Sequence, residues 1–250
     1  MSLDLSGITI VFDLDGTLVD TAPDLAAAAN HVFGLIGLAP VSPAELHPMI
    51  GRGSRAMIEE GLRLRGVVRT PAEVDRLHEL FFPYYADNIA VLSRPFAGIP
   101  ALLDNLLQAG AQLAVCTNKL EGLSRSLLRQ LALQERFAAI AGRDTFDVFK
   151  PAPGHLIRTI AMAGGRPELA VMVGDSEVDI ATAIAAGVPS IGVTFGYTTV
   201  PVRNLNASAV IDHYGEFMEA LETALAVSNE MANLGASPGS RAGAVVAHGE

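Results

Sequence analysis

Short apolar runs rich in β-branched residues recur along the chain, and several of them end abruptly in polar residues. The first run, residues 8–12, leads directly into acidic residues. Runs of this length and composition are typical of buried β-strands. The pattern predicts strands at residues 8–12, 112–117, 170–173 and 189–194, with weaker candidates at 138–141 and 209–211.

Helix-length amphipathic segments separate these runs. Strands that alternate with helices are typical of parallel βαβ units, so we predict an α/β fold with a doubly wound parallel sheet. The predicted helices of this part of the chain cover residues 98–110, 121–131, 153–163, 176–186 and 214–226.

Residues 21–94 break the alternation, because they show helical patterning and no convincing strand. We expect helices at 22–36, 52–65 and 71–92, separated by loops at 41–43, 47–53 and 70–71. This pattern predicts a helical domain, residues 21–94, inserted into a core domain made of residues 1–20 and 95–227. The hinges would lie near residues 19–21 and 94–98. Residues 228–250 are rich in Gly, Ala and Ser, and we expect them to form a disordered tail.

Composition narrows the possible partners. The chain of 250 residues carries a formal net charge of −10. Such a surface repels nucleic acid and anionic membranes, so we expect neither as a partner. The single cysteine, Cys116, permits no internal disulfide, and its apolar neighbours favour packing over catalysis. With no membrane-length apolar run and no secretory signal, we expect a cytoplasmic protein, monomeric or homodimeric.

Polar residues follow several of the predicted strands at the point where each strand ends. In an open parallel sheet, ligands bind beyond the carboxyl ends of the strands. Asp13 and Asp15 are two residues apart on an extended chain, so both side chains can face one pocket. We expect the following residues to collect there: Asp13, Asp15, Gly16, Thr117, Asn118, Lys150, Asp175, Ser176 and Asp179.

Carboxylates gathered in a partly buried site need a cation, because like charges raise one another's pKa. Oxygen ligands without a His or Cys cluster favour Mg²⁺, which would also hold a phosphate oxygen. One of Asp13 and Asp15 could be a nucleophile and the other a general acid or base. Gly16 allows a tight turn that brings backbone N–H groups close to a phosphoryl oxygen.

Four segments of the chain resemble, in order and spacing, the four sequence motifs of the haloacid dehalogenase superfamily. The resemblance covers residues 8–226 and implies a Rossmann-like core, with the inserted helices as its cap domain. It also implies phosphoryl transfer through an aspartyl phosphate. The segments are Asp13-Leu14-Asp15-Gly16-Thr17, Thr117-Asn118, Lys150-Pro151 and Gly174-Asp175-Ser176 followed by Asp179.

The resemblance assigns a role to each of these residues. Asp13 would attack phosphorus, and Asp15 would protonate the leaving alkoxide and then deprotonate the attacking water. Thr117, the backbone near Asn118 and Lys150 would hold the phosphoryl oxygens. Mg²⁺ would be held by the Asp13 carboxylate, the Asp15 backbone carbonyl and Asp175. Asp179, together with Ser176, would orient these groups from behind.

Within the superfamily, residues 116–119, 148–153, 173–176 and 192–197 look most like phosphoglycolate phosphatases. Their substrate, 2-phosphoglycolate, is a two-carbon carboxylate phosphate, and Arg52 in the loop at residues 50–53 could hold its carboxylate bidentately. A solvated helix face is the equal alternative for Arg52. Related enzymes with similar motifs hydrolyse sugar phosphates, nucleotides or pyrophosphate, so these substrates stay open.

Other functions fit the motifs less well. Asp15 argues against a dehalogenase proper, and the absence of lysine from residues 18–95 argues against a phosphonate hydrolase. A β-phosphoglucomutase-like phosphomutase keeps both aspartates and stays open. The alternative outside the enzymes is a phosphoryl-receiver switch, which would not explain the large insertion. Continued release of phosphate would distinguish an enzyme from a receiver.

Some residues carry no clear signal. Lys119 follows the Thr117-Asn118 segment and could lie at the pocket rim or in solvent. The six histidines show no ligand spacing, and we expect them to be ordinary core or surface residues. The aromatic residues at 81–82 and 84–85 are expected to pack inside the insertion.

Overall fold

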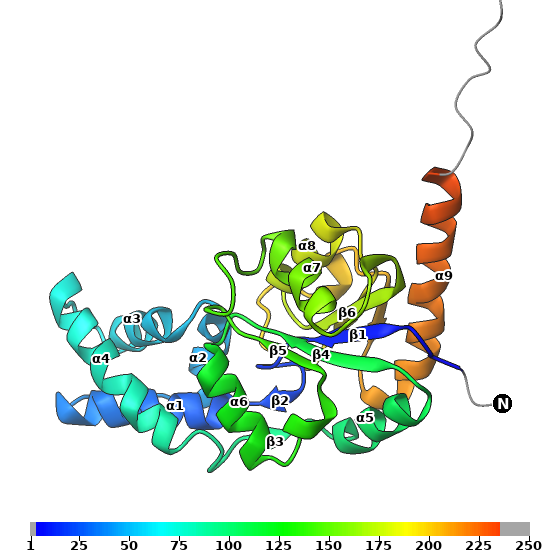
Figure 1. Cartoon of the computed structure of the whole chain (residues 1–250). Coiled ribbons are helices and arrows are strands. Elements are labelled where there is room, and N and C mark those ends of the chain that lie inside the picture. Colours follow the sequence, from blue (N-terminus) through cyan, green and yellow to red (C-terminus); the bar gives the residue numbers. More distant parts are fainter. Residues whose placement is uncertain (1–3, 236–250) are drawn as a thin grey trace, which may run out of the picture.

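The computed structural model describes residues 4–235 and is built around a six-stranded parallel sheet (Figure 1). The strands lie in the order β5-β4-β1-β6-β7-β8, so β1 is central, between β4 and β6. This arrangement confirms the predicted α/β fold with a doubly wound sheet. The strands are β1 Thr9–Phe12, β4 Gln112–Cys116, β5 Ala139–Ala141, β6 Ala170–Gly174, β7 Ser190–Val193 and β8 Ala209–Ile211.

Helices cover both faces of the sheet. Successive residues of a strand point to opposite faces, and those of β1 are all buried, so both faces must be covered. Val11 packs with α7 (Pro153–Met162) and α8 (Glu177–Ala186) on one face. Ile10 and Phe12 face the other side, which carries the larger apolar cluster. Burying each large apolar side chain contributes about 1.5–3 kcal/mol before entropy is subtracted. The helices of this second face are α5 (Ile99–Gln108), α6 (Glu121–Gln130) and α9 (Phe217–Gly235).

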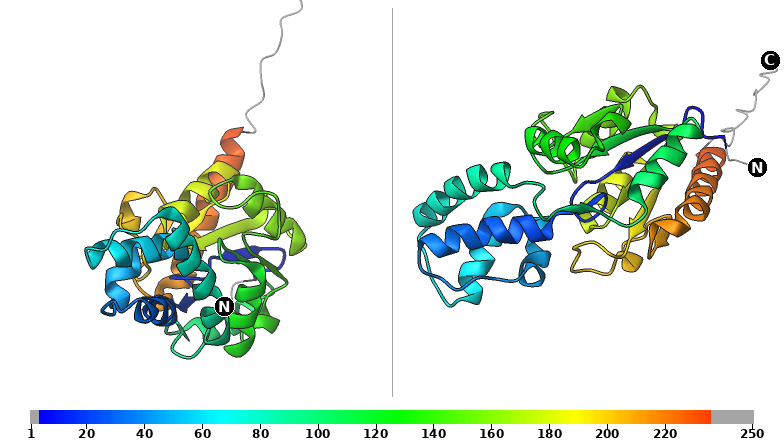
Figure 2. Two further views of the ribbon diagram at one scale, coloured as in Figure 1. Left: turned by 90° about the vertical axis from the view of Figure 1, so that its left-hand side faces the viewer. Right: turned by 90° about the horizontal axis from the view of Figure 1, so that it is seen from below.

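The helical insertion lies between the two strands of a short antiparallel pair that follows β1. β2 (Val19–Asp20) pairs with β3 (Arg94–Pro95), and the two strands form the stem of the insertion. The insertion forms a separate lobe beside one edge of the core (Figure 2). Its four helices are α1 (Ala22–Leu35), α2 (Pro43–Ile50), α3 (Ser54–Leu64) and α4 (Pro71–Asp87).

Helix α2 differs from the sequence-based expectation of loops at residues 41–43 and 47–53. The Ser42 side chain accepts from the Glu45 backbone N–H, and the Glu45 carboxylate accepts from the Ser42 N–H. This capping box, with Pro43 in the first turn, starts a helix that is only eight residues long. A segment this short, with Pro48 inside it, has too few apolar positions to show a helical period.

The last described helix also corrects the prediction for the end of the chain. α9 extends to Gly235, so residues 228–235 are helical, where disorder was expected from residue 228. The physical reason is that this stretch contains no Gly or Pro before Gly235. The remainder of the predicted tail, residues 236–250, lies outside the described residues. Among the described helices, none is both long and apolar enough to cross a membrane.

Candidate active site

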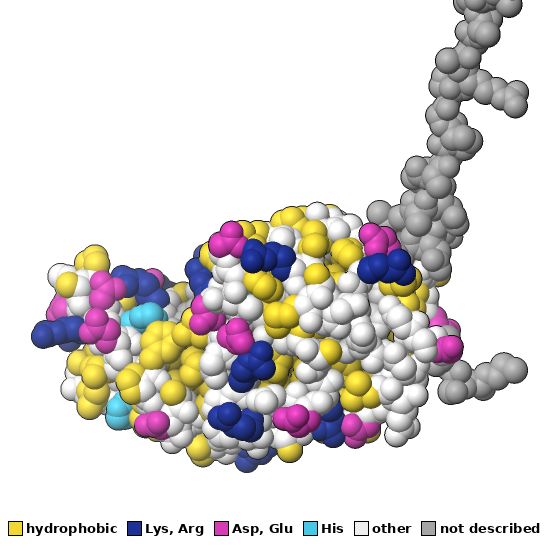
Figure 3. Space-filling model, viewed as in Figure 1, with side chains coloured by type: hydrophobic (Ala, Val, Ile, Leu, Met, Phe, Trp, Pro, Cys, Tyr) yellow, Lys and Arg dark blue, Asp and Glu magenta, His cyan; other side chains and the backbone are white. Residues whose placement is uncertain are grey.

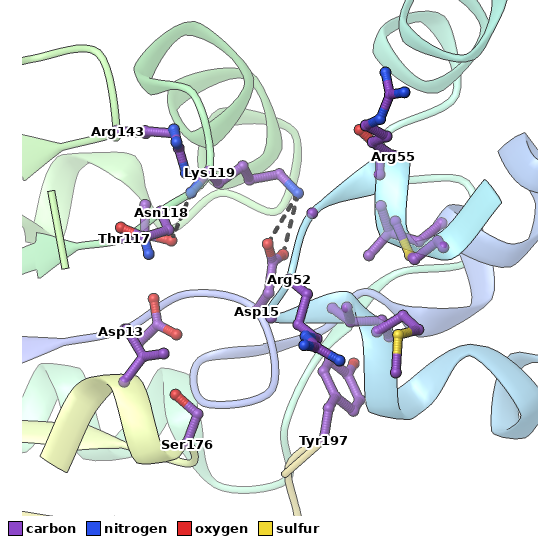
Figure 4. Close-up of a pocket in the computed structure, with 18 of the residues that line it drawn as sticks. Asp13, Asp15, Arg52, Arg55, Thr117, Asn118, Lys119, Arg143, Ser176 and Tyr197 are labelled. Atoms are coloured by element: carbon purple, nitrogen blue, oxygen red, sulfur yellow. Dashed lines mark hydrogen bonds and ion pairs between the residues drawn. The ribbon is translucent and has the colours of Figure 1, made fainter. Parts of the chain in front are cut away.

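A cavity of about 780 Å³ lies between the carboxyl ends of the central strands and the helical insertion (Figure 4). Both parts of the molecule line it. Of the residues singled out from the sequence, Gly16 and Asp179 do not line the cavity. The others do: Asp13, Asp15, Arg52, Thr117, Asn118, Lys150, Asp175 and Ser176.

Asp13 stands at the carboxyl end of β1, the central strand. Its backbone N–H donates to the Val173 carbonyl of β6 across 2.9 Å, which continues the strand pairing to the edge of the cavity. The residue is 8% exposed. Burial raises the pKa of the Asp13 carboxyl to about 6, while the Lys150 ammonium opposes this shift. Asp13 is thus a buried carboxyl group that needs positive charge nearby.

Lys150 supplies part of that charge. Its Nζ lies 2.9 Å from Asp13 Oδ1 and 2.5 Å from Asp179 Oδ1. Burial by itself disfavours the ammonium, but the two carboxylates outweigh it and raise the pKa of Lys150. The second Asp179 oxygen accepts from the backbone N–H and the hydroxyl of Ser176, at 3.1 and 2.6 Å. Asp179 therefore fixes Lys150 from behind, and the same carboxylate caps α8.

Asp175, at the end of β6, sits in a close-fitting cradle. Its Oδ1 accepts from the Thr17 hydroxyl at 3.1 Å, and its Oδ2 accepts from the Tyr197 N–H at 2.7 Å. A Cβ atom at Gly16 would lie 2.7 Å from Asp175 Oδ2, and one at Gly196 would lie 2.2 Å from Asp175 Cβ. Burial, together with Asp179 and Asp13, raises the pKa of Asp175 to about 8. A side chain at either glycine would therefore collide with the Asp175 carboxylate.

The donor set fits a metal ion. One carboxylate oxygen from each of Asp13, Asp175 and Asp179 lies within 4.8 Å of the others, and all three residues are buried. Asp13 Oδ1 has no hydrogen-bond partner of good geometry among the described residues, although the Lys150 ammonium is close. Both Asp179 oxygens already accept hydrogen bonds. Asp179 is used more fully than Asp175, because its Oδ2 accepts two hydrogen bonds and its Oδ1 pairs with the Lys150 ammonium, whereas each Asp175 oxygen accepts one. Asp13 and Asp175 are therefore the carboxylates with more capacity left for a cation.

Asp15 points away from this acidic cluster and toward Lys119 (Figure 4). The Lys119 Nζ donates to Asp15 Oδ1 and Oδ2 at 3.1 and 3.2 Å. It also donates to the hydroxyl of Tyr85, on α4 of the insertion, at 2.6 Å. Only the Asp15 backbone, not its carboxylate, is thus left as a predicted metal ligand.

Thr117 and Asn118 follow β4 and shape the loop opposite Asp13. The Thr117 hydroxyl accepts from the Lys119 N–H at 3.2 Å, and the Asn118 side-chain amide donates to the Lys150 carbonyl at 2.9 Å. These bonds tie the loop after β4 to the loop that carries Lys150. Thr117 lines the cavity.

Arg52 enters the cavity from the turn between α2 and α3 (Figure 4). No described acid forms an ion pair with it, in contrast to most arginines of the insertion. Acidic and basic side chains lie close together on this lobe (Figure 3). The insertion's paired arginines are Arg55, Arg63, Arg65 and Arg69.

Comparison with known families identifies the chain. Residues 10–193 match the family described as haloacid dehalogenase-like hydrolase. The chain belongs to this family. The match includes the predicted site residues and the whole helical insertion.

Similar proteins of this hydrolase family include curated relatives and solved structures. A phosphoglycolate phosphatase of Agrobacterium fabrum is 48% identical over 84% of this chain and 91% of its own length. The Caulobacter vibrioides phosphoglycolate phosphatase is 43% identical over 89% and 94%. A crystal structure of a predicted phosphoglycolate phosphatase from Haemophilus somnus superposes with a TM-score of 0.79 at 26% identity. It covers 87% of this chain and 98% of the other.

Sequence reasoning missed three residues at the site of this haloacid dehalogenase-like hydrolase. Lys119 was left open between rim and solvent, and Tyr85 was expected only to pack, although its hydroxyl reaches the core. Tyr197 carried no prediction of its own, yet it touches Asp175 and packs against His47 with ring centroids 5.0 Å apart. The position of Lys119 beside the Thr117-Asn118 segment was the one available signal; no local pattern marks Tyr85.

Proposed function

We propose that this hydrolase is a Mg²⁺-dependent phosphatase that converts 2-phosphoglycolate to glycolate and phosphate through a phosphorylated Asp13. The observation that carries the proposal is the setting of Asp13. Its carboxylate has one buried oxygen, Oδ1, without a good hydrogen bond and 2.9 Å from the Lys150 ammonium, and the residue lines the cavity beside Asp175. A nucleophilic carboxylate needs this combination of access and compensating charge.

In the proposed reaction each of the site residues has its own role. Asp13 attacks phosphorus, and Asp15 gives a proton to the leaving oxygen and later takes one from water. Lys150 and Thr117 hold phosphoryl oxygens. Asp13, Asp175 and the Asp15 carbonyl would hold Mg²⁺, with Asp179 and Ser176 as orienting residues. When bound, Mg²⁺ neutralises charge on the transferring phosphoryl group.

Two features support the substrate. The relatives described above carry the name phosphoglycolate phosphatase and cover most of this chain. Arg52, unpaired among the described residues, lines the cavity that Asp13 also lines. An arginine there would bind the carboxylate of a phosphorylated carboxylic acid, and sugar phosphates lack that group.

We also propose that the chain divides into a catalytic core, residues 1–20 and 95–227, and a cap, residues 21–94. The β2–β3 pair would act as the hinge. A cap that covers the cavity would exclude water while the phosphoryl group is transferred. The same cap orientation in structures with and without a bound phosphate analogue would argue against this motion.

Phosphate release from a panel of phosphoesters, with and without Mg²⁺, tests the proposed function. The panel contains 2-phosphoglycolate, hexose phosphates, a nucleotide monophosphate, pyrophosphate and p-nitrophenyl phosphate. We expect Mg²⁺-dependent release with a preference for 2-phosphoglycolate. Asp13→Asn should lower the rate by about a thousandfold or more, because the nucleophile is lost.

Asp147→Asn is the matched control, since this carboxylate is 80% exposed and pairs only with Arg158 among the described residues. It should leave the rate unchanged. Release that is unaffected by Asp13→Asn would overturn the assignment of the nucleophile. Release from hexose phosphates alone would overturn the assignment of the substrate.

A further inference from the structure

Lys119 is a buried lysine that joins the core to the helical insertion. Its side chain is 5% exposed, and its Nζ contacts Asp15 of the core and Tyr85 of α4. An ammonium group has three donors, and three acceptor atoms surround this one: two oxygens of Asp15 and the hydroxyl of Tyr85. All three donors are thus used, and the ammonium has none left for a substrate in this arrangement. Figure 4 shows the two bonds to Asp15.

The backbone of Lys119 is fixed as firmly as its ammonium group. Its N–H donates to the Thr117 hydroxyl at 3.2 Å, and its carbonyl accepts from the Arg143 N–H at 2.9 Å. A Cβ atom at Gly142 would lie 2.6 Å from the Lys119 carbonyl oxygen, so the two loops pack without spare room. The core therefore fixes the backbone from which the side chain starts, and Asp15 and Tyr85 together hold Nζ at its other end.

We propose that Lys119 is a positioning residue that holds the Asp15 carboxylate in the orientation for proton transfer. Because Tyr85 belongs to the insertion, the orientation of Lys119 and Asp15 would then depend on the contact between the insertion and the core. The inference rests on the proposed phosphatase function and adds a residue that acts through Asp15. A buried lysine is costly unless its charge is compensated, and Asp15 supplies the compensating charge.

The chemistry shows where such positioning matters. In the first step an Asp13 oxygen bonds to phosphorus, the bond from phosphorus to the leaving oxygen breaks, and that oxygen takes a proton from Asp15. In the second step a water oxygen bonds to phosphorus, the bond to Asp13 breaks, and the proton of the water passes to Asp15. Both steps therefore need Asp15 in place. The first step does not need it when the leaving group departs without a proton.

p-Nitrophenyl phosphate provides this exception, because p-nitrophenolate is a stable anion that leaves unprotonated. With Lys119→Met, rapid mixing should show a fast burst of about one nitrophenolate per enzyme. A steady-state rate roughly 10- to 100-fold below that of the wild type should follow, because only the second step needs Asp15. With 2-phosphoglycolate the same variant should show no burst of glycolate, since its first step also needs a proton.

A double-mutant comparison separates positioning from substrate binding. Lys119→Met added to Asp15→Asn should be no slower than Asp15→Asn alone, within about twofold, because Lys119 acts through Asp15. Tyr85→Phe removes one hydroxyl and little packing. It should lower the steady-state rate by about 2- to 10-fold, and it should have no effect in the Lys119→Met background. Arg166→Met, which removes an exposed charge without an ion pair among the described residues, should match the wild type.

The outcomes are distinct from those that test the proposed function. No phosphate release by the wild-type protein would overturn that function, and this inference with it. In an active protein, a Lys119→Met variant that loses the burst, or that changes KM alone, would overturn the positioning role and make Lys119 a substrate-binding residue. Full additivity with Asp15→Asn would also overturn it. Tyr85→Phe keeps the test decisive even if Lys119→Met does not fold.

Discussion

The backbone N–H of Tyr197 donates to Asp175 Oδ2 across 2.7 Å. The hydroxyl of the same tyrosine reaches the stem of the helical insertion. It donates to Asp20 Oδ1 at 2.5 Å and accepts from the Thr21 and Ala22 N–H groups at 2.7 and 3.0 Å. A single residue therefore connects the acidic cluster, through its backbone, to the first turn of α1, through its side chain.

Removing this hydroxyl should destabilise the protein. The side chain of Thr21, the N-cap residue of α1, makes no capping hydrogen bond. The Tyr197 hydroxyl accepts from the first N–H groups instead. We expect Tyr197→Phe to lower the free energy of unfolding by about 1–3 kcal/mol, because buried N–H groups lose their acceptor. Urea denaturation measures this change. Tyr84→Phe is the control, since the Tyr84 hydroxyl has no hydrogen bond among the described residues, and an equal effect of both would contradict the prediction.

The ion pair between Lys150 and Asp179 should contribute far more to stability than an exposed pair. Asp179 is fully buried and also caps α8. Asp179→Asn leaves the buried Lys150 with one carboxylate fewer, so we expect a loss of about 3–5 kcal/mol in chemical denaturation. Asp104→Asn removes the partner of Arg136 on the surface, where the side chain of Asp104 is 50% exposed, and should cost about 0–1 kcal/mol. Similar losses for the two variants would show that the buried ion pair of Lys150 contributes no more to stability than the exposed one.

The strands and the acidic site were predictable from sequence because each depends on short local patterns. The run at residues 8–12 has the β-branched composition of a buried strand, and Asp13 follows it directly. Once the strands are parallel, their carboxyl ends meet at one edge, which brings Asp175 beside Asp13 without further information. Helix α2 was missed because its eight residues are too few for a helical period to emerge.

Contacts between the insertion and the core could not be predicted in this way. Whether the Tyr85 hydroxyl reaches Lys119 depends on how α4 lies against the core, and no spacing within either segment encodes that distance. Tyr197 is similar, because its three partners at the stem come from residues far away in the chain. The position of His47, whose ring packs against Tyr197, also depends on packing and not on any ligand spacing.

The close contact between Gly196 and Asp175 predicts that one added methyl group will weaken Mg²⁺ binding. A Cβ at Gly196 would lie 2.2 Å from Asp175 Cβ, so Gly196→Ala must displace the carboxylate or its loop. We expect at least about tenfold weaker Mg²⁺ binding, measured by calorimetry, because metal sites tolerate little displacement of a ligand. Gly122→Ala, where a Cβ would meet no atom within 4 Å, should bind Mg²⁺ as the wild type does. Unchanged binding by Gly196→Ala would remove Asp175 from the ligand set.

Stabilisation by Mg²⁺ should grow with pH. Without metal, burial raises the pKa of Asp13 to about 6 and that of Asp175 to about 8, above the value of about 4 expected in the unfolded chain. The folded protein then binds more protons than the unfolded chain, so these groups lose their stabilising contribution as pH rises from about 4 through 8. Mg²⁺ requires the deprotonated carboxylates and cancels this loss.

Thermal melting with EDTA and with Mg²⁺ at pH 5.5 and 8.5 checks this prediction. The difference in Tm between the two conditions should be clearly larger at pH 8.5. The Asp175→Asn variant should show little difference at either pH. A difference in Tm that is the same at both pH values in the wild type would contradict the link between the buried carboxylates and the metal.

Arg52 should determine preference for a substrate that carries a carboxylate. Ethyl phosphate resembles 2-phosphoglycolate in size but lacks that group. A charge-assisted hydrogen bond contributes about 1.5–3 kcal/mol, so Arg52→Ala should raise KM for 2-phosphoglycolate by about 10- to 100-fold and leave KM for ethyl phosphate within about twofold. Arg52→Lys should recover only part of the loss, because an ammonium cannot bind a carboxylate with two parallel hydrogen bonds. Arg63→Ala, which removes an exposed arginine paired with Glu60, should change neither value. If Arg52→Ala and Arg63→Ala behave alike, the carboxylate must be held by another cavity residue, and the other arginines that line the cavity, Arg55 and Arg143, become the next to test.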